Sequence, residues 1–257
     1  MKTTIIEEVT KSELKNPILV EGLPGLGMVG RIATRYLVKQ LKAKKLARLY
    51  SPHFPYYVLV NKKGSVRLLY GEFMFWKNEA GENDFIFFTG DSQAQTIEGQ
   101  YEVASCILDF AEKNGVKIIV TIGGYRKEVE KTPNVVAVST SSSLLNQALK
   151  SKALLSSAGN PIVGTAGILL GLAKLRKTEA ICLLGETRGY LPDPKAAKSV
   201  VEVLGKMFGI KVDITELDKD IEKSKEIVER MQEIEKRREK YAQKMRRVEE
   251  ERITYIS

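Results

Sequence analysis

Cysteine and histidine are scarce in this chain of 257 residues, which holds two cysteines and one histidine. Cys106 and Cys182 stand alone in apolar segments, without the paired spacing of a zinc site or a disulfide framework. We therefore expect both to be small buried side chains. His53 lies between two prolines in SPHFPYY. A single histidine excludes a catalytic triad or a metal site assembled from several histidines.

Long apolar runs are absent as well. None approaches the roughly 18 to 20 residues that span a bilayer, and the first ten residues lack the apolar stretch of a secretory signal. The composition is 43% hydrophobic and 28% charged, as in a globular protein with a highly charged surface. We expect a cytoplasmic protein without a membrane partner. Abundant Lys and Glu with little Cys and His is also typical of proteins from thermophiles.

Positive charge is in excess and is unevenly distributed. The net charge is +9, yet residues 214–257 hold twelve basic and twelve acidic side chains, so residues 1–213 carry the whole excess. This basic surface could attract nucleic acid or an acidic protein face. Diffuse charge of this kind more often serves solubility.

Strand and helix patterns alternate along residues 1–213, which predicts one α/β domain. Strand patterns lie at residues 17–22, 45–51, 56–60, 66–76, 84–91, 116–124, 134–140 and 179–186. Helical spacing is found at residues 27–41, 97–113, 141–151, 164–175 and 193–210. The order predicts a three-layer sandwich with a mixed, largely parallel sheet and antiparallel strands with a hairpin near residues 45–76.

From residue 214 glycine disappears and charges of both signs alternate. Apolar side chains recur at helical spacing, at Leu217, Ile221, Val228, Met231, Ile234, Tyr241, Met245 and Val248. The pattern predicts a charged helical arm over 214–257, ending in a short tail and on the order of 55 Å long. Such a helix packs on its own domain, pairs with another chain as in a coiled coil, or projects as an arm.

The sequence EGLPGLGMVG follows the first buried strand pattern and precedes a helix. Its glycines Gly25, Gly27 and Gly30 match the spacing of the dinucleotide-binding fingerprint. The next strand lacks the acidic residue that holds a ribose 2′-hydroxyl, and only Arg48 or Ser51 could favour a 2′-phosphate. The alternatives are therefore an NADP-dependent dehydrogenase or a tight structural turn that allows close packing of the helix on the sheet.

Polar side chains also follow two other strand patterns, where α/β folds hold ligands. They are Asp91, Ser92 and Gln93 after one strand, and Glu186, Arg188 and Asp193 after another. At adjacent strand ends these groups could bind a nucleoside, which leaves a nucleoside-processing enzyme as an alternative. However, no histidine, nucleophile elbow or phosphate-binding lysine completes a mechanism.

Five segments together resemble the proteasome-assembling chaperone family in its archaeal form. They are ILVEGLPGLGMVGRIA, TGDSQ, IGGY, GTAGILLGLAK and CLLGETRGYLPDPKAA, spread over residues 16–210. The most specific element is the loop with Gly22, Pro24, Gly25, Gly27 and Gly30. The resemblance implies a nucleoside phosphorylase-like fold, homo-oligomers, a structural role for this loop, and chaperone function in proteasome assembly rather than catalysis.

The resemblance also draws attention to the C-terminal end of the chain. Some members of the family end in a hydrophobic residue, tyrosine and one final residue, and this tail inserts between proteasome α subunits. Here the last residues are Ile253, Thr254, Tyr255, Ile256 and Ser257, so that Ile256 stands where the tyrosine is expected. We expect these five residues to contact a protein partner.

The sequence therefore predicts a non-enzymatic, homo-oligomeric chaperone or adaptor. Its expected partners are copies of itself and proteasome α subunits or another assembly chaperone, with no cofactor or metal. A third interpretation uses the basic stretch at residues 236–247 to bind nucleic acid. Such runs on charged helices usually face solvent or pair with acidic neighbours, so nucleic acid is not the expected partner.

Overall fold

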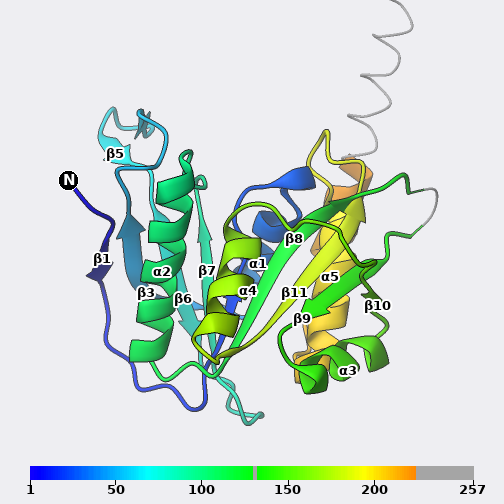
Figure 1. Ribbon diagram of the computed structural model, residues 1–257. Coiled ribbons are helices and arrows are strands. Elements are labelled where there is room, and N and C mark those ends of the chain that lie inside the picture. The colour runs from blue at the N-terminus through cyan, green and yellow to red at the C-terminus, as the bar shows by residue number, and fades with distance from the viewer. Residues whose placement is uncertain (130–131, 224–257) are drawn as a thin grey trace, which may run out of the picture. The chain divides into compact units, whose positions relative to one another are not determined.

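The computed structural model describes residues 1–129 and 132–223 (Figure 1). The chain divides into two compact units, Met1–Leu217 and Asp218–Ser257. Residues 215–223 are helical, whereas the rest of the predicted arm, including the tail 253–257, lies outside the described residues. Leu217 is buried with the core of the first unit.

A mixed sheet of nine strands forms the centre of the first unit in its described part, in the order β1-β3-β6-β7-β2-β8-β11-β9-β10. The strands are β1 (Ile5–Glu8), β2 (Ile18–Glu21), β3 (Lys44–Tyr50), β6 (Gly71–Trp76), β7 (Phe85–Gly90), β8 (Ile118–Arg126), β9 (Val135–Ser139), β10 (Leu154–Leu155) and β11 (Glu179–Thr187). The neighbours β7, β2, β8 and β11 run parallel. The pairs from β1 to β7 and the pair β11–β9 are antiparallel.

The α/β fold with a large mixed sheet is therefore confirmed. Parallel pairing is confined to the four central strands and the short β9–β10 pair, so the antiparallel share is larger than the sequence patterns indicated. The pattern of β9 gave no sign of its direction. Its five residues follow β8 after a loop and turn back along β11. The edge strands β1 and β10 were not predicted.

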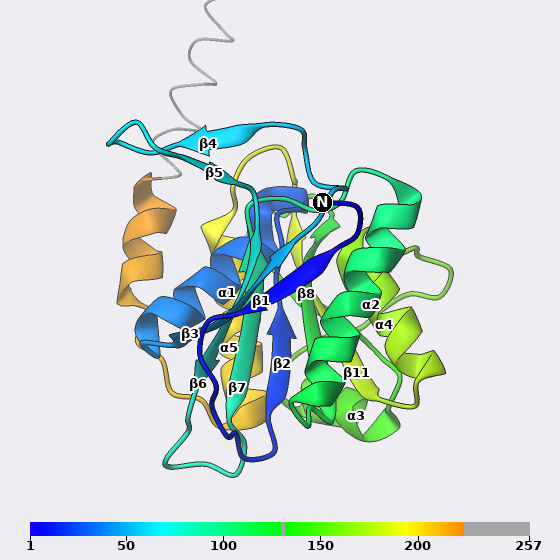
Figure 2. The same ribbon diagram turned by 90° about the vertical axis from the view of Figure 1, so that its left-hand side faces the viewer.

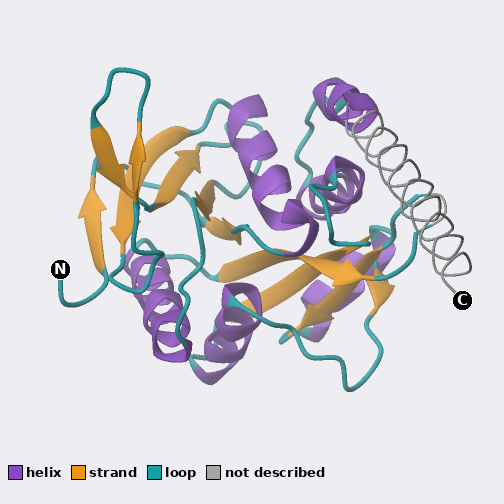
Figure 3. Cartoon of the chain, turned by 90° about the horizontal axis from the view of Figure 1, so that it is seen from above, coloured by secondary structure: helices purple, strands orange, loops and turns teal. Residues whose placement is uncertain are grey.

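Helices cover both faces of the sheet, as the view from above shows (Figure 3). They are α1 (Val29–Gln40), α2 (Ile97–Lys113), α3 (Ser142–Lys150), α4 (Thr165–Leu175) and α5 (Pro194–Phe208), with a 3-10 turn η1 (Leu26–Met28) before α1. One core packs α2 and α4 against the sheet, and the other packs α1, α3 and α5. This is the predicted three-layer arrangement.

The apolar run in β7 explains why its strand lies in the middle of these layers. Phe85 and Phe87 point to the core under α1 and α5, whereas Ile86 and Phe88 point to the core under α2 and α4. All four side chains are fully buried. A strand with apolar residues on both faces is stable only between two helical layers.

The segment between β3 and β6 forms a separate two-stranded hairpin of β4 (Val58–Val60) and β5 (Val66–Leu68). Figure 2 shows it beyond the end of the large sheet. The apolar run 66–76 is therefore divided, because β5 pairs with β4 and β6 pairs with β3 and β7. The predicted hairpin near residues 45–76 is present here.

Candidate functional site

The predicted glycine and polar residues lie at the carboxyl ends of β2, β7 and β11 and in the loops that follow them. These strands are parallel, so their carboxyl ends meet at one edge of the sheet. The glycine loop of residues 22–30 leaves the end of β2 at the centre of this edge.

Two glycines of this loop lie where the backbone of α1 meets the sheet. A Cβ atom at Gly22 would collide with the carbonyl oxygen of Gly30 and with Thr34 Oγ1. A Cβ atom at Gly30 would collide with the carbonyl oxygen of Ile122 in β8. Glycine is therefore required for the close approach of α1 to β2 and β8.

The middle of the loop is tied to the loops on both sides. Gly27 has φ +59°, and its carbonyl accepts the N–H of Asp193 at 2.8 Å. The Pro24 carbonyl accepts Gln93 Nε2 at 2.7 Å, and Thr89 Oγ1 donates to the Gly22 carbonyl at 2.7 Å. The loop backbone thus bonds with the protein itself at each of these points.

The position of β3 removes the support for a dinucleotide site. Arg48 and Ser51, the candidates for holding a 2′-phosphate, lie on or just after β3. Two strands, β6 and β7, separate β3 from β2 in the sheet. In a dinucleotide-binding fold the residue that holds the ribose lies on the strand beside the glycine loop. Ser51 Oγ instead accepts the hydroxyl of Thr4 at 2.9 Å.

Asp91, at the end of β7, holds the β4–β5 hairpin. Its carboxylate accepts two hydrogen bonds from Arg67, at 2.5 and 3.1 Å, and the N–H of Tyr70 at 3.2 Å. Arg31 of α1 lies 4.0 Å away. Partial burial alone would raise the pKa of Asp91, but the hydrogen bonds from Arg67 and Tyr70 and the nearby positive charges outweigh it and lower the pKa. The carboxylate therefore stays charged and bonded.

Gln93 links the glycine loop to the start of α4. While its Nε2 bonds to Pro24, its Oε1 accepts the N–H of Thr165 at 3.0 Å and the Thr165 hydroxyl at 3.2 Å. Thr165 is fully buried, and its hydroxyl also lies 2.8 Å from Gln100 Oε1, so its single proton is shared between the two amide oxygens. Ser92 Oγ bonds to the carbonyl of Gln93 at 3.0 Å.

The polar groups at the end of β11 and in the loop after it are bonded in the same way. Glu186 is 3% exposed and accepts Lys127 Nζ at 2.6 Å and the N–H of Asn134 at 3.0 Å. Burial would raise its pKa, but these hydrogen bonds and the charge of Lys127 lower it. Asp193 caps α5 by accepting the N–H of Ala196 at 2.9 Å, and Arg188 pairs with Glu128 at 2.9 Å.

The expectation that these two groups lie at adjacent strand ends is wrong. Asp91 follows β7 and Glu186 lies near the end of β11, and β2 and β8 lie between these strands. The direction of each parallel strand could be predicted from the sequence, but the order of strands in the sheet could not. The carboxylates therefore bind separate basic partners and form no shared nucleoside site.

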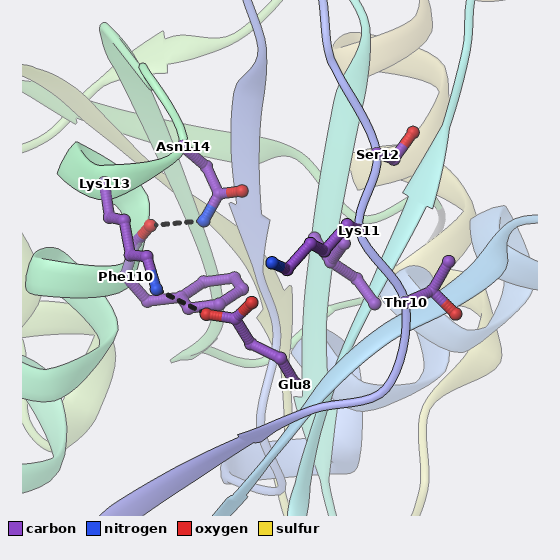
Figure 4. A pocket seen from close by; sticks show the side chains of 8 residues that line it. Glu8, Thr10, Lys11, Ser12, Phe110, Lys113 and Asn114 are labelled. Atoms are coloured by element: carbon purple, nitrogen blue, oxygen red, sulfur yellow. Dashed lines mark hydrogen bonds and ion pairs between the residues drawn. The ribbon is translucent and has the colours of Figure 1, made fainter.

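A pocket of about 260 Å³ lies elsewhere, between the segment after β1 and the C-terminal end of α2 (Figure 4). It is lined by Glu8, Thr10, Lys11, Ser12, Leu46, Phe110, Lys113 and Asn114. Lys113 Nζ lies 2.5 Å from Glu8 Oε1 and lowers the pKa of that carboxyl. This contact is an ion pair between β1 and α2. Because it lowers the pKa of Glu8, this carboxylate is poorly suited to accept a proton near neutral pH.

Residues 1–129 and 132–223 contain no group of three or more His, Cys, Asp or Glu side chains that could hold a metal ion. Within the same ranges, no helix has both the length and the apolar composition needed to cross a membrane.

Comparison with protein families identifies the chain. A model of the PAC2 family matches residues 19–232, a range that includes the glycine loop and the loops after β7 and β11. The chain belongs to the PAC2 family. An uncharacterized protein of Methanocaldococcus jannaschii is 35% identical to this PAC2 protein over 245 residues, which are 95% of this chain and 93% of the relative.

Two solved structures of Pyrococcus furiosus proteins have the same fold. PbaB, described as an archaeal proteasome activator, is 39% identical with a TM-score of 0.86 over 90% of this chain and 100% of PbaB. PbaA, described as an archaeal homolog of proteasome-assembly chaperone, is 29% identical with a TM-score of 0.75 over 96% of this chain and 97% of PbaA. The predicted resemblance to archaeal proteasome-assembling chaperones is thereby confirmed.

The sequence patterns did not indicate which basic residues pair with the carboxylates at the strand ends. Arg67 is 24 residues from Asp91, and Lys127 is 59 residues from Glu186. Nothing in the local pattern of either residue signals the contact. The tail residues 253–257, the predicted partner contact, lie outside the described residues.

Proposed function

We propose that this PAC2 protein is a non-enzymatic chaperone or adaptor that assists proteasome assembly or activity by binding proteasome α subunits. The observation that carries the proposal is the similarity to PbaB, at 39% identity and TM-score 0.86 over the whole of that chain. PbaA, an archaeal homolog of proteasome-assembly chaperone, has the same fold. A likeness along an entire chain is a stronger argument for shared function than a shared fold alone.

The contacts of the strand-end polar groups favour a structural role for these groups over a catalytic one. Asp91, Gln93, Glu186 and Asp193 each bond to neighbouring segments of the chain. A catalytic acid or base needs a proton that it exchanges with a substrate, and a pKa near the working pH. The lowered pKa values of Asp91 and Glu186 favour permanently charged anchors instead.

We further propose that the protein works as a homo-oligomer in the cytoplasm, and that Ile253, Thr254, Tyr255, Ile256 and Ser257 contact the α subunits. A second assembly chaperone is the other partner that this role allows. Apolar side chains at the end of a charged segment can bind a small hydrophobic pocket of a partner, while the charged residues before them keep the segment soluble. The structural role of Gly22, Pro24, Gly25, Gly27 and Gly30 belongs to the same proposal.

Light scattering after size exclusion tests this function. The full chain is run alone and mixed with archaeal proteasome α subunits, beside a variant that lacks residues 253–257. We expect a defined oligomer, a complex with the α subunits, and loss of that complex in the shortened variant. A full chain that stays monomeric and leaves the α subunits unbound would refute the proposal.

A further inference from the structure

The β4–β5 hairpin exposes a continuous aliphatic surface. The register pairs Val58 with Leu68 and Val60 with Val66. Residues opposite one another, and residues two apart on one strand, point to the same face of a sheet. These four side chains therefore lie together, and they are between 47% and 67% exposed. We name them the aliphatic face of the hairpin, whose two strands are seen in Figure 2.

The other face of the hairpin is fixed to the body of the protein. Leu59 and Arg67 are a cross-strand pair on that side, and Leu59 is half-buried. Arg67 makes its two hydrogen bonds to Asp91 and places its guanidinium 4.6 Å from the centre of the Tyr70 ring. Because this side is turned inward, the aliphatic face is turned away from the body.

The charge around the aliphatic face has one sign. Residues 56–69 contain no Asp or Glu, and Lys62 and Lys63 are exposed at the tip, whereas Arg67 is paired with Asp91 on the other face. A second copy of the same hairpin would bring these positive charges against each other, which is unfavourable. The complementary partner has an aliphatic centre and acidic residues around it.

The distribution of polar residues favours a protein over a lipid surface. The tip of the hairpin is Asn61, Lys62, Lys63, Gly64 and Ser65, where Asn61 Oδ1 accepts the N–H of Lys63 at 2.9 Å. A hairpin that enters a membrane has its apolar residues at the tip. Here they lie along the two strands, away from the polar tip, an arrangement that suits a protein contact.

We propose that the aliphatic face is a docking surface for an acidic protein face on the α subunit, distinct from the contact of the C-terminal residues. The inference rests on the proposed function for the identity of this partner. The chemistry of the partner, aliphatic with an acidic rim, comes from the hairpin itself. Asp91, in the segment TGDSQ, then acts as a positioning residue that keeps the docking surface rigid through Arg67.

The test uses the full chain and the double variant Val60→Ser/Val66→Ser. Both sites are exposed, so the fold is retained. Val163→Ser is the matched control, since Val163 is 86% exposed outside the hairpin. Binding to archaeal proteasome α subunits is measured by titration calorimetry. We expect the double variant to bind about tenfold more weakly or worse, and the control to bind like the wild type.

A charge variant separates the two parts of the surface. Lys62→Glu/Lys63→Glu should weaken binding and reduce its dependence on salt, because exposed charges are screened at high ionic strength. Lys117→Glu, at an exposed site in the loop before β8, should have little effect. Circular dichroism and light scattering on each variant check the fold and the oligomer mass.

The outcomes separate this inference from the proposed function. If the wild type binds no α subunit, both fail. If the wild type binds and the double variant binds equally well, only the docking surface is refuted. A change in oligomer mass caused by Val60→Ser/Val66→Ser would assign the face to a second copy of the chain. Binding to anionic phosphatidylserine vesicles that is lost with the same substitutions would assign it to a membrane. Either result overturns the proposal.

Discussion

Glu21 ends β2 directly under the glycine loop and is 1% exposed. Its Oε1 accepts the N–H of Leu23 at 3.1 Å, while its Oε2 has no hydrogen-bond partner among the described residues. Burial raises the pKa of this carboxyl from 4.5 to about 8, against the smaller opposite effect of the Leu23 N–H. The folded protein therefore keeps Glu21 protonated at neutral pH.

The free energy of unfolding depends on pH because the pKa of Glu21 differs between the folded and the unfolded protein. The unfolded chain releases this proton above pH 4.5 and the folded chain only near pH 8, so the free energy of unfolding decreases between these values. Glu21→Gln removes the effect. We expect the wild type to lose up to about 1.4 kcal/mol per pH unit relative to the variant in this window. Urea unfolding at pH 5, 6.5 and 8 measures the difference, and parallel profiles for the two proteins would contradict it.

Gly30 and Gly171 make a matched pair for testing the role of the glycine loop. Both lie in helices, α1 and α4, but a Cβ atom at Gly30 would collide with the Ile122 carbonyl, and one at Gly171 meets nothing within 4 Å. We expect Gly30→Ala to lower the free energy of unfolding by about 2–3 kcal/mol through overpacking. Gly171→Ala should raise it by up to about 1 kcal/mol. Equal effects of the two substitutions in thermal or urea unfolding would argue against close packing as the role of Gly30.

Among the structural elements, the β4–β5 hairpin depends most on a single contact. It shares no backbone pairing with the nine-stranded sheet. Arg67 links it to Asp91, whose carboxylate also receives the N–H of Tyr70. A two-stranded hairpin alone is at best marginally stable in water. We therefore expect the contact between Arg67 and Asp91 to determine how well ordered the hairpin is.

Asp91→Asn tests this contact. The amide keeps an acceptor for Tyr70 but loses the charge that binds Arg67, so the hairpin should open more often while the sheet stays intact. We expect faster hydrogen exchange at residues 58–68, by about tenfold, with a change in global stability of about 1 kcal/mol or less. Hydrogen-exchange mass spectrometry compares it with Glu128→Gln, which breaks the ion pair with Arg188 instead. Unchanged exchange in the hairpin would show that other contacts hold it.

The reactivity of the Cys182 thiol measures how readily the central strands separate. It is fully buried in β11, between β8 and β9, and burial raises the pKa of its thiol to about 12. Reaction requires the exposed thiolate, and exposure requires separation of the central strands. Cys106, on α2, is half-buried.

The Cys106→Ala variant leaves Cys182 as its single thiol. We expect labelling by a disulfide reagent under native conditions to proceed only through global unfolding, so that the free energy from labelling equals that from urea unfolding. Cys182→Ala is the control, in which the half-buried Cys106 should react much faster. Rapid labelling of Cys182 would instead indicate local opening of β11 or β9.

Local sequence signals were sufficient for most elements of the first unit. The helix predicted at 97–113 has those bounds, and it is capped by Thr96, whose Oγ1 accepts the N–H of Gly99 at 3.0 Å. The helix that opens at Pro194 is capped by Asp193 and closed by Gly209 at φ +66°. Capping contacts and apolar periodicity involve residues only one helical turn apart. Helices can therefore be predicted from residues that are neighbours in the sequence.

The order of the strands, and the direction of β9, had to come from the tertiary structure. β1 and β10 are four and two residues long, and their exposed side chains carry no periodic pattern. β9 runs antiparallel to β11 although helical segments separate the two strands along the chain. Pairing depends on contacts between residues far apart in sequence, and each strand has two edges that could accept a neighbour.

The sequence by itself determined the α/β class, the central apolar strands, the helix bounds and the family, because these follow from local periodicity, capping and a glycine-rich motif. Only the tertiary structure decided what the polar residues do. It separated Asp91 from Glu186 by two strands, joined each to a distant basic residue, and turned the aliphatic face of the hairpin outward. The physical reason is that charge pairing and exposure are set by distances in space, which the chain reaches only after its sheet is assembled.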